Sequence, residues 1–95
     1  MNYNMKEVGT RIKQLRKEKG LTQEQLAENL DITAGTIGKI EIGRTGISID
    51  LLICMSDFFE VPTDYIILGK KSDMHLLKEE IHNIIVKLEE IEKSM

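Results

Sequence analysis

The side chains that could bind a phosphate or a base edge lie mostly in the first half of the sequence. Residues 1–44 carry eight basic against six acidic side chains, whereas residues 45–95 carry five against ten. Lys and Arg neutralise backbone phosphates, and polar side chains hydrogen-bond phosphates or base edges. A basic first half joined to an acidic second half is compatible with one part contacting phosphate and the other contacting protein, although an ordinary solvated surface explains the charges equally well.

Two other arrangements could do chemistry, and both are weak. His75, Glu79 and His82 share one helical face, but a solvated face is favoured over a zinc site because the sequence offers no fourth ligand. Cys54 is the single cysteine, so no internal disulfide can form, and no His pattern accompanies it for thiol catalysis. The sequence therefore predicts no metal, no cofactor and no enzyme activity.

Length and composition indicate one compact, helix-rich domain. The chain has 95 residues, of which 41% are apolar, 4% are aromatic and one is proline. The N-terminus has no apolar signal segment, and no apolar run approaches the roughly 20 residues that span a bilayer. We expect no membrane partner, and the lone cysteine fits a reducing cytoplasm.

Caps and apolar stripes predict the elements that must position these side chains, and together they give an all-α fold. A first helix has Met5, Val8, Ile12 and Leu15 on one face and ends at Gly20. Four further helices follow: one opened by a capping box at Thr22 and ending near Leu30, one capped by Thr33 and ending before Gly43, one from Ser48 to about Phe59, and one from Thr63 to Leu68 closed by Gly69.

The second and third of these helices are joined by the short turn Asp31–Thr33, which is the outline of a helix-turn-helix. The segments LTQEQLA at 21–27 and ITAGTIGKIEIG at 32–43 resemble the phage repressor and Cro group, also called the Xre family. The resemblance extends from about Val8 to Gly69. It implies a five-helix DNA-binding domain that acts as a dimer on a partly palindromic operator, with the third helix in the major groove of double-stranded DNA.

The resemblance also assigns roles to individual residues. It implies a phosphate contact for Gln23, which is otherwise an ordinary first residue of a helix, and an ion pair between Arg16 and Glu41, which are otherwise unrelated surface charges. Base readout is expected from the exposed side of the third helix, which comprises Thr33, Ala34, Gly35, Thr36, Gly38 and Lys39. Further phosphate contacts are expected at the helix start near Ser48 and at Arg44, Arg11 and Lys13, although each of these charges could simply be solvated.

Two glycines weaken the third helix. Gly35 and Gly38 each cost about 1 kcal/mol relative to Ala. Either DNA approaches the backbone closely there, or the helix no longer reads bases. We favour close approach, supplemented by indirect readout of DNA shape.

A second apolar stripe is expected on the fourth helix. Ile49, Leu52, Met55 and Phe59 form the predicted core stripe, which leaves Leu51, Cys54 and Phe58 on another face, with Tyr65 beyond them in the fifth helix. Such a stripe would stand in water in a monomer. We expect a dimer interface here, covered by the C-terminal helix or by the partner subunit.

The C-terminal part carries an unbroken heptad pattern. Residues 1–69 are predicted to form the DNA-binding domain, 70–72 a hinge, and 73–95 an oligomerisation helix with Leu77, Ile81, Ile84, Leu88 and Ile91 in its interface. This helix either pairs between two subunits of a homodimer or folds back on its own domain.

These observations predict a transcriptional repressor. The alternative is an interaction module of the same fold whose third helix no longer reads DNA and whose acidic tail binds a partner protein. The two hypotheses differ in what they predict for Gln23, Lys39 and Arg44. A repressor needs these residues for DNA binding, whereas an interaction module does not need them.

Overall fold

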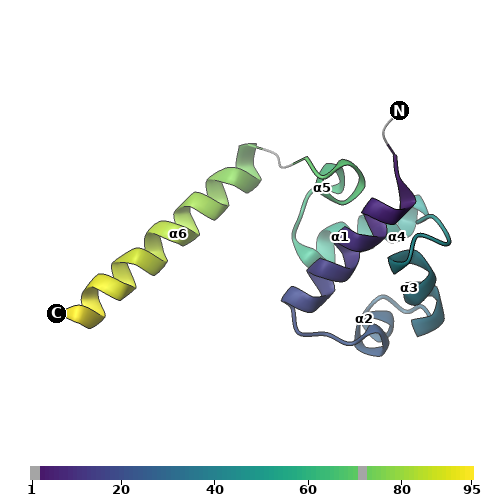
Figure 1. Ribbon diagram of the computed structural model, residues 1–95, viewed down its shortest axis with the longest axis horizontal. Coiled ribbons are helices and arrows are strands. Elements are labelled where there is room, and N and C mark those ends of the chain that lie inside the picture. Colours follow the sequence, from purple (N-terminus) through teal and green to yellow (C-terminus); the bar gives the residue numbers. More distant parts are fainter. Residues whose placement is uncertain (1–2, 71–72) are drawn as a thin grey trace.

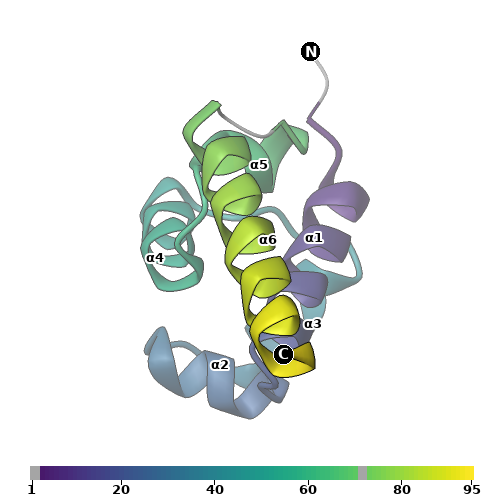
Figure 2. The ribbon, with the colours of Figure 1, turned by 90° about the vertical axis from the view of Figure 1, so that its left-hand side faces the viewer.

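A computed structural model describes residues 3–70 and 73–95, apart from the side chains of residues 73–75. The described part is entirely helical, which confirms the predicted fold class (Figure 1). Its helices are α1 (Met5–Glu18), α2 (Gln23–Asn29), α3 (Ala34–Glu41), α4 (Ile49–Phe59), α5 (Thr63–Leu68) and α6 (Asp73–Ser94). The first five pack together, and α6 extends away from them. Figure 2 shows the molecule from the side of α6, with α4 and α2 on one side of it and α1 on the other.

The predicted caps begin and end the helices. Thr22 and Gln25 form a reciprocal capping box, in which the Gln25 amide donates to the Thr22 hydroxyl at 3.1 Å and the Thr22 amide donates to Gln25 Oε1 at 2.9 Å. Thr33 and Ser48 each accept a hydrogen bond from the amide three residues on, at 3.1 Å. Gly20, with φ +70°, lies just after α1, where a left-handed residue ends a helix without steric cost.

Each of the first five helices contributes to one core. Ile12, Leu26, Ile37, Met55 and Ile66, one from each helix in order, have no exposed surface. Burying side chains of this size stabilises a fold by about 1.5–3 kcal/mol each. The core therefore fixes α3, although that helix has only eight residues and two glycines.

Helices α1 and α3 approach each other through Gly9. A Cβ atom at this position would collide with the backbone oxygen of Ile40 and would lie 2.7 Å from that of Glu41. Backbone atoms within a helix cannot easily move aside. Gly9 is therefore required for the contact that positions α3, a role that we did not predict from the sequence.

The predicted orientation of α4 is wrong in part. Leu51 and Phe58 do not stand in water, because they are half-buried against the core of their own domain, as is Tyr65 of α5. Conversely, Ile49 was placed in the core stripe and is 75% exposed. Cys54 is exposed, as expected.

The orientation of α4 differs from the prediction because the buried face of this helix is centred on Met55. Met55 is fully buried, so the residues one turn away from it, Leu51 and Phe59, turn inward with it. Ile49 and Ile53 then point to solvent on the opposite side, and Ile53 is 51% exposed. The apolar surface that α4 leaves open is thus a pair of isoleucines and not the predicted stripe.

Every described side chain of α6 is exposed. The predicted hinge at 70–72 falls mainly on residues 71 and 72, which lie outside the described residues, so the division between domain and C-terminal helix stays a prediction. Within residues 3–70 and 73–95, no helix combines the length and the apolar character needed to cross a bilayer.

Candidate nucleic-acid interface

Helices α2 and α3 form the helix-turn-helix, and their connection is fixed by the backbone. The Ile32 amide donates to the Ala27 carbonyl at 3.0 Å, and Asp31 takes the left-handed conformation with φ +55°. The turn then delivers Thr33 as the cap of α3. Ile37 and Ile40 face the core, and Gly35 and Lys39 therefore lie on the exposed side of the same helix.

The structure forms the ion pair expected between Arg16 and Glu41. Arg16 donates from Nε to Glu41 Oε2 at 2.7 Å and from Nη2 to Oε1 at 3.0 Å. Its Nη1 donates to the Leu21 carbonyl at 2.7 Å, so the guanidinium also holds the loop before α2. Both residues are buried, and the hydrogen bond to Glu41 raises the pKa of Arg16 above its ordinary value. One guanidinium therefore joins α1, the start of α2 and the end of α3.

The same carboxylate also holds Gln23. Gln23 Nε2 donates to Glu41 Oε1 at 3.1 Å, and its side chain is half-buried. The carboxamide lies beside Gly38, since a Cβ at that position would be 3.6 Å from Gln23 Oε1. This bond uses one of the two N–H donors of the amide and leaves the other and the carbonyl oxygen for a ligand. The start of α2 and the middle of α3 are thus fixed side by side.

The outer face of α3 presents few polar atoms. The hydroxyls of Thr33 and Thr36 bond to each other at 2.8 Å, and Thr33 also accepts the cap bond. A Cβ at Gly35 would meet nothing nearer than the Thr33 hydroxyl at 3.9 Å. Ala34, Thr36 and Gly38 are half-buried, which corrects the expectation that all six residues lie fully on the exposed side, and their contacts with DNA stay predictions. The exposed charged group of this helix is Lys39.

Three of the other expected phosphate contacts are exposed at the surface. Arg44 is exposed in the loop that follows α3, and its amide donates to the Lys39 carbonyl at 2.9 Å. Ser48 is exposed at the start of α4, and Lys13 is exposed on α1. Their contacts with DNA stay predictions.

Comparison with known proteins agrees with this geometry. The sequence pattern of the helix-turn-helix family matches residues 12–66, more than half of the chain. The transcriptional regulator ImmR of Bacillus subtilis (strain 168) is 30% identical over 87 residues, which cover 87% of this chain and 68% of ImmR. The chain belongs to the Xre-type helix-turn-helix family.

Two further members show how far the similarity extends. The transcriptional activator BcrR of Enterococcus faecalis is 40% identical over 65 residues, which cover 68% of this Xre-type chain. The match spans only 32% of BcrR, so the two proteins correspond over about a third of the activator. The master regulator for biofilm formation SinR, solved in complex with DNA, is 35% identical and superposes with a TM-score of 0.58 over 62% of this chain and 95% of the SinR chain in that structure.

One expected phosphate contact of this Xre-type domain has another role. Arg11 donates from Nε to the Ile66 carbonyl at 2.8 Å and from Nη2 to the Ile67 carbonyl at 2.8 Å. These carbonyls lie in the last turn of α5, which lacks further helical donors. The geometry therefore does not favour the phosphate contact predicted for Arg11, because two of its donors tie α1 to α5. Sequence analysis missed this contact because the partners lie 55 and 56 residues apart.

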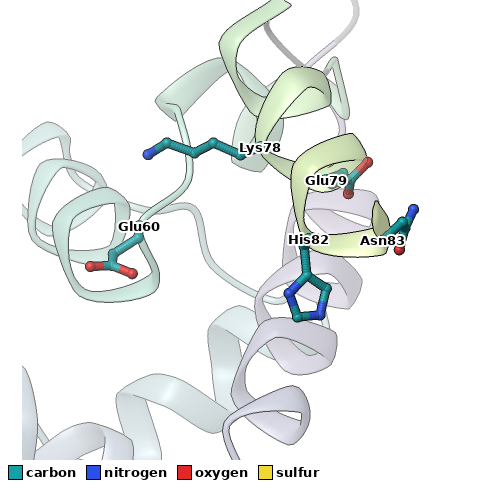
Figure 3. Close-up of a pocket in the computed structure, with 5 residues that line it drawn as sticks. All are labelled: Glu60, Lys78, Glu79, His82 and Asn83. Atoms are coloured by element: carbon teal, nitrogen blue, oxygen red, sulfur yellow. The ribbon is translucent and has the colours of Figure 1, made fainter. Parts of the chain in front are cut away.

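A pocket of about 550 Å³, lined by polar and charged residues, lies away from the helix-turn-helix, between the end of α4 and α6. Figure 3 shows Glu60 on one side of it and Lys78, Glu79, His82 and Asn83 on the other. Among the described residues no group of three His, Cys, Asp or Glu side chains could hold a metal ion. The side chain of His75, which belonged to the rejected zinc pattern, lies outside the described residues.

Proposed function

We propose that this chain is a transcriptional repressor that binds a palindromic operator in double-stranded DNA as a dimer, with α3 of each subunit in the major groove. Phosphate contacts from Gln23, Arg44, Ser48 and Lys13 orient the domain, and Thr33, Gly35, Thr36, Gly38 and Lys39 face the bases.

One observation carries the proposal: Glu41 binds Gln23 and Arg16 at the same time. A helix-turn-helix binds DNA by fixing the backbone-contacting start of one helix relative to the helix that enters the groove. Here that relation is set by one buried carboxylate, which leaves the outer side of Gly38 directly beside the Gln23 amide. The arrangement suits a phosphate contact next to a groove contact.

The relatives support DNA as the partner. ImmR and BcrR are transcriptional regulators, and SinR was solved bound to DNA. Repression is the simplest outcome of such binding, because a dimer on a promoter competes with polymerase for the same duplex. Two copies of one domain match a palindromic site, whose half-sites are about one helical turn apart.

Titration of the full chain with duplex DNA at several salt concentrations tests the proposal. Arg44→Ala should weaken binding to all sequences and reduce the salt slope by about 1. Gln23→Ala should weaken binding to all sequences with little change of slope, because an amide releases no counterion. Lys39→Ala should relax the preference at one base pair by about 1–3 kcal/mol if this lysine contacts a base.

Two exposed residues serve as controls for these variants. Gln14→Ala on α1 and Lys93→Ala at the end of α6 remove the same side-chain types without altering the interface, and both should bind as the unmodified chain does. Absence of binding even at low salt would overturn the proposal. It would favour an interaction module, in which charge changes at Glu79, Glu80, Glu89 and Glu90 alter binding of a partner protein.

A further inference from the structure

The apolar face of α6 is a continuous apolar surface that no other part of the described residues covers. We call its residues the α6 seam: Leu77, Ile81, Ile84, Leu88 and Ile91. They are between 49% and 60% exposed. Soluble monomers rarely leave a continuous stripe of this kind in water. We therefore infer that another protein surface covers the α6 seam.

The chain's own domain does not cover the α6 seam. The side of α6 that lines the pocket beside the domain is polar, and consists of Lys78, Glu79, His82 and Asn83 (Figure 3). At about 100° per residue Glu79, His82 and Asn83 fall on the side of the helix opposite the seam, and Lys78 falls at the edge of the seam. The seam consequently points away from the domain.

The apolar surface that α4 leaves open is also a poor cover. Ile49 and Ile53 of α4 are exposed, but Asp50 and Asp57 flank them on the same face. The surface of α6 is itself acidic, with six acidic against three basic residues between positions 73 and 94. Folding α6 onto α4 would place like charges together, which opposes contact.

The pattern of α6 suits a second copy of itself. The seam residues follow one another at spacings of four, three, four and three, which is the repeat of helices that supercoil about each other. The positions on either side of the seam are Lys78, Glu80, Lys87 and Glu92, besides the apolar Ile85. Two positive and two negative flanking charges let one copy of this face complement another, whereas an acidic or a basic partner would meet two like charges.

We propose that the α6 seam packs against the α6 seam of a second copy of this chain, and that this pairing makes binding to a palindromic operator depend on the concentration of the chain. The second part rests on the proposed function. An isolated helix of 22 residues is only marginally stable in water, so pairing and helix formation support each other. Joining two domains in this way raises the local concentration of the second domain at its half-site.

Sedimentation equilibrium of the full chain tests the pairing. The unmodified chain should be a dimer that dissociates on dilution. Ile84→Asp places a charge in the middle of the seam and should give a monomer. Val86→Asp introduces the same charge on the opposite side of the same helix, at the same cost in helix propensity, and should remain a dimer. Ile49→Asp on α4 should also remain a dimer.

Three outcomes would overturn the pairing: a monomeric unmodified chain, a dimer that persists in Ile84→Asp, or a monomer in Val86→Asp. Because α6 does not contribute to the core, Ile84→Asp should retain a folded domain, which a thermal unfolding transition of the domain verifies.

A second experiment, which measures binding to duplexes with one or two operator half-sites, distinguishes a failure of this inference from a failure of the proposed function. Ile84→Asp should bind a duplex with one half-site as the unmodified chain does, and should lose on the order of 100-fold in affinity for a duplex with two. Equal loss on both duplexes would contradict the role of the seam in operator binding. No DNA binding by a chain that is still dimeric would instead overturn the proposed function and leave the pairing standing.

Discussion

The domain formed by α1 to α5 and the helix α6 differ in where their apolar side chains go. In the domain, each helix places at least one fully buried residue in a shared core, and a buried ion pair joins α1 to α3. In α6, the heptad residues are all about half-exposed. The first five helices thus cover their apolar side chains with one another, whereas α6 leaves its apolar face uncovered.

The two regions also use charge differently. Arg16 and Glu41 are buried within the domain and define the relation of α1 to α3. The charges of α6 lie at the surface, where single pairs contribute only about 0–1 kcal/mol. Substitutions in the domain should therefore change its free energy of unfolding, and substitutions in α6 should change association. The following five predictions test that separation, and the four substitutions among them run from the largest effect to the smallest.

Glu41→Ala should produce the largest change. It leaves the buried guanidinium of Arg16 without its carboxylate, which typically costs about 3–5 kcal/mol. Urea unfolding measures the loss, and Glu28→Ala on the exposed side of α2 should stay within about 0.5 kcal/mol of the unmodified chain. A loss below about 1 kcal/mol would show that the pair does not hold the domain together.

The stabilisation that Arg16 contributes through the ion pair should not change with pH near neutrality. The pKa of Arg16 is raised in the folded state, so the stabilisation is fully present below its unfolded value and disappears only as the pH rises through the folded value. Both values lie far into the alkaline range. The difference in unfolding free energy between the unmodified chain and Glu41→Ala should thus show no contribution from Arg16 titration between about pH 6 and 9.

Gly9→Ala should destabilise the domain by about 1–3 kcal/mol, as overpacking at a rigid contact does. Its added methyl group meets the backbone oxygen atoms of Ile40 and Glu41. Urea unfolding measures this as well. An unchanged midpoint would mean that α1 and α3 can separate without cost.

Gly35→Ala should raise the free energy of unfolding, whereas Gly9→Ala should lower it. The added methyl group enters open space in the free protein, and Ala favours a helix interior over Gly by about 1 kcal/mol. The free chain should become more stable by up to about that amount. If a DNA backbone or base approaches this position closely, the same variant should bind its operator more weakly, so stability and affinity should change in opposite directions.

Ile84→Asp should have the smallest effect on the domain. Its free energy of unfolding should stay within about 0.5 kcal/mol of that of the unmodified chain. Tyrosine fluorescence can follow this transition, because both tyrosines of the chain, Tyr3 and Tyr65, precede α6 in the sequence. A large shift would show that α6 stabilises the domain and that the two regions are not independent.

Much of the domain could be predicted from the sequence, because its signals are local. Thr22, Thr33 and Ser48 cap the helices that they were expected to cap, since a cap depends only on residues two or three positions away. The Arg16–Glu41 pair came from the family resemblance. The contacts of Arg11 with the end of α5 and of Gln23 with Glu41 could not be predicted, since they join residues distant in sequence.

The orientation of α4 was misjudged for a different reason. Positions 49 and 51–55 are all apolar, so several faces of this helix have similar hydrophobicity and periodicity does not single out one of them. Packing decides, and it selects the face around Met55. Gly9 did carry a sequence signal that was overlooked, since a glycine adjacent to Val8 on the buried face of a helix indicates a close backbone approach.

Selection of bound sites from a random pool of duplex DNA tests the central claim most directly, because it needs no knowledge of the operator. The account predicts enrichment of an inverted repeat whose half-sites are about 10 base pairs apart. It also predicts that Lys39→Ala changes the enriched sequence, whereas Gln23→Ala enriches the same sequence with lower affinity. A pool that shows no enrichment at low salt would contradict the account and assign this domain to a function other than DNA recognition.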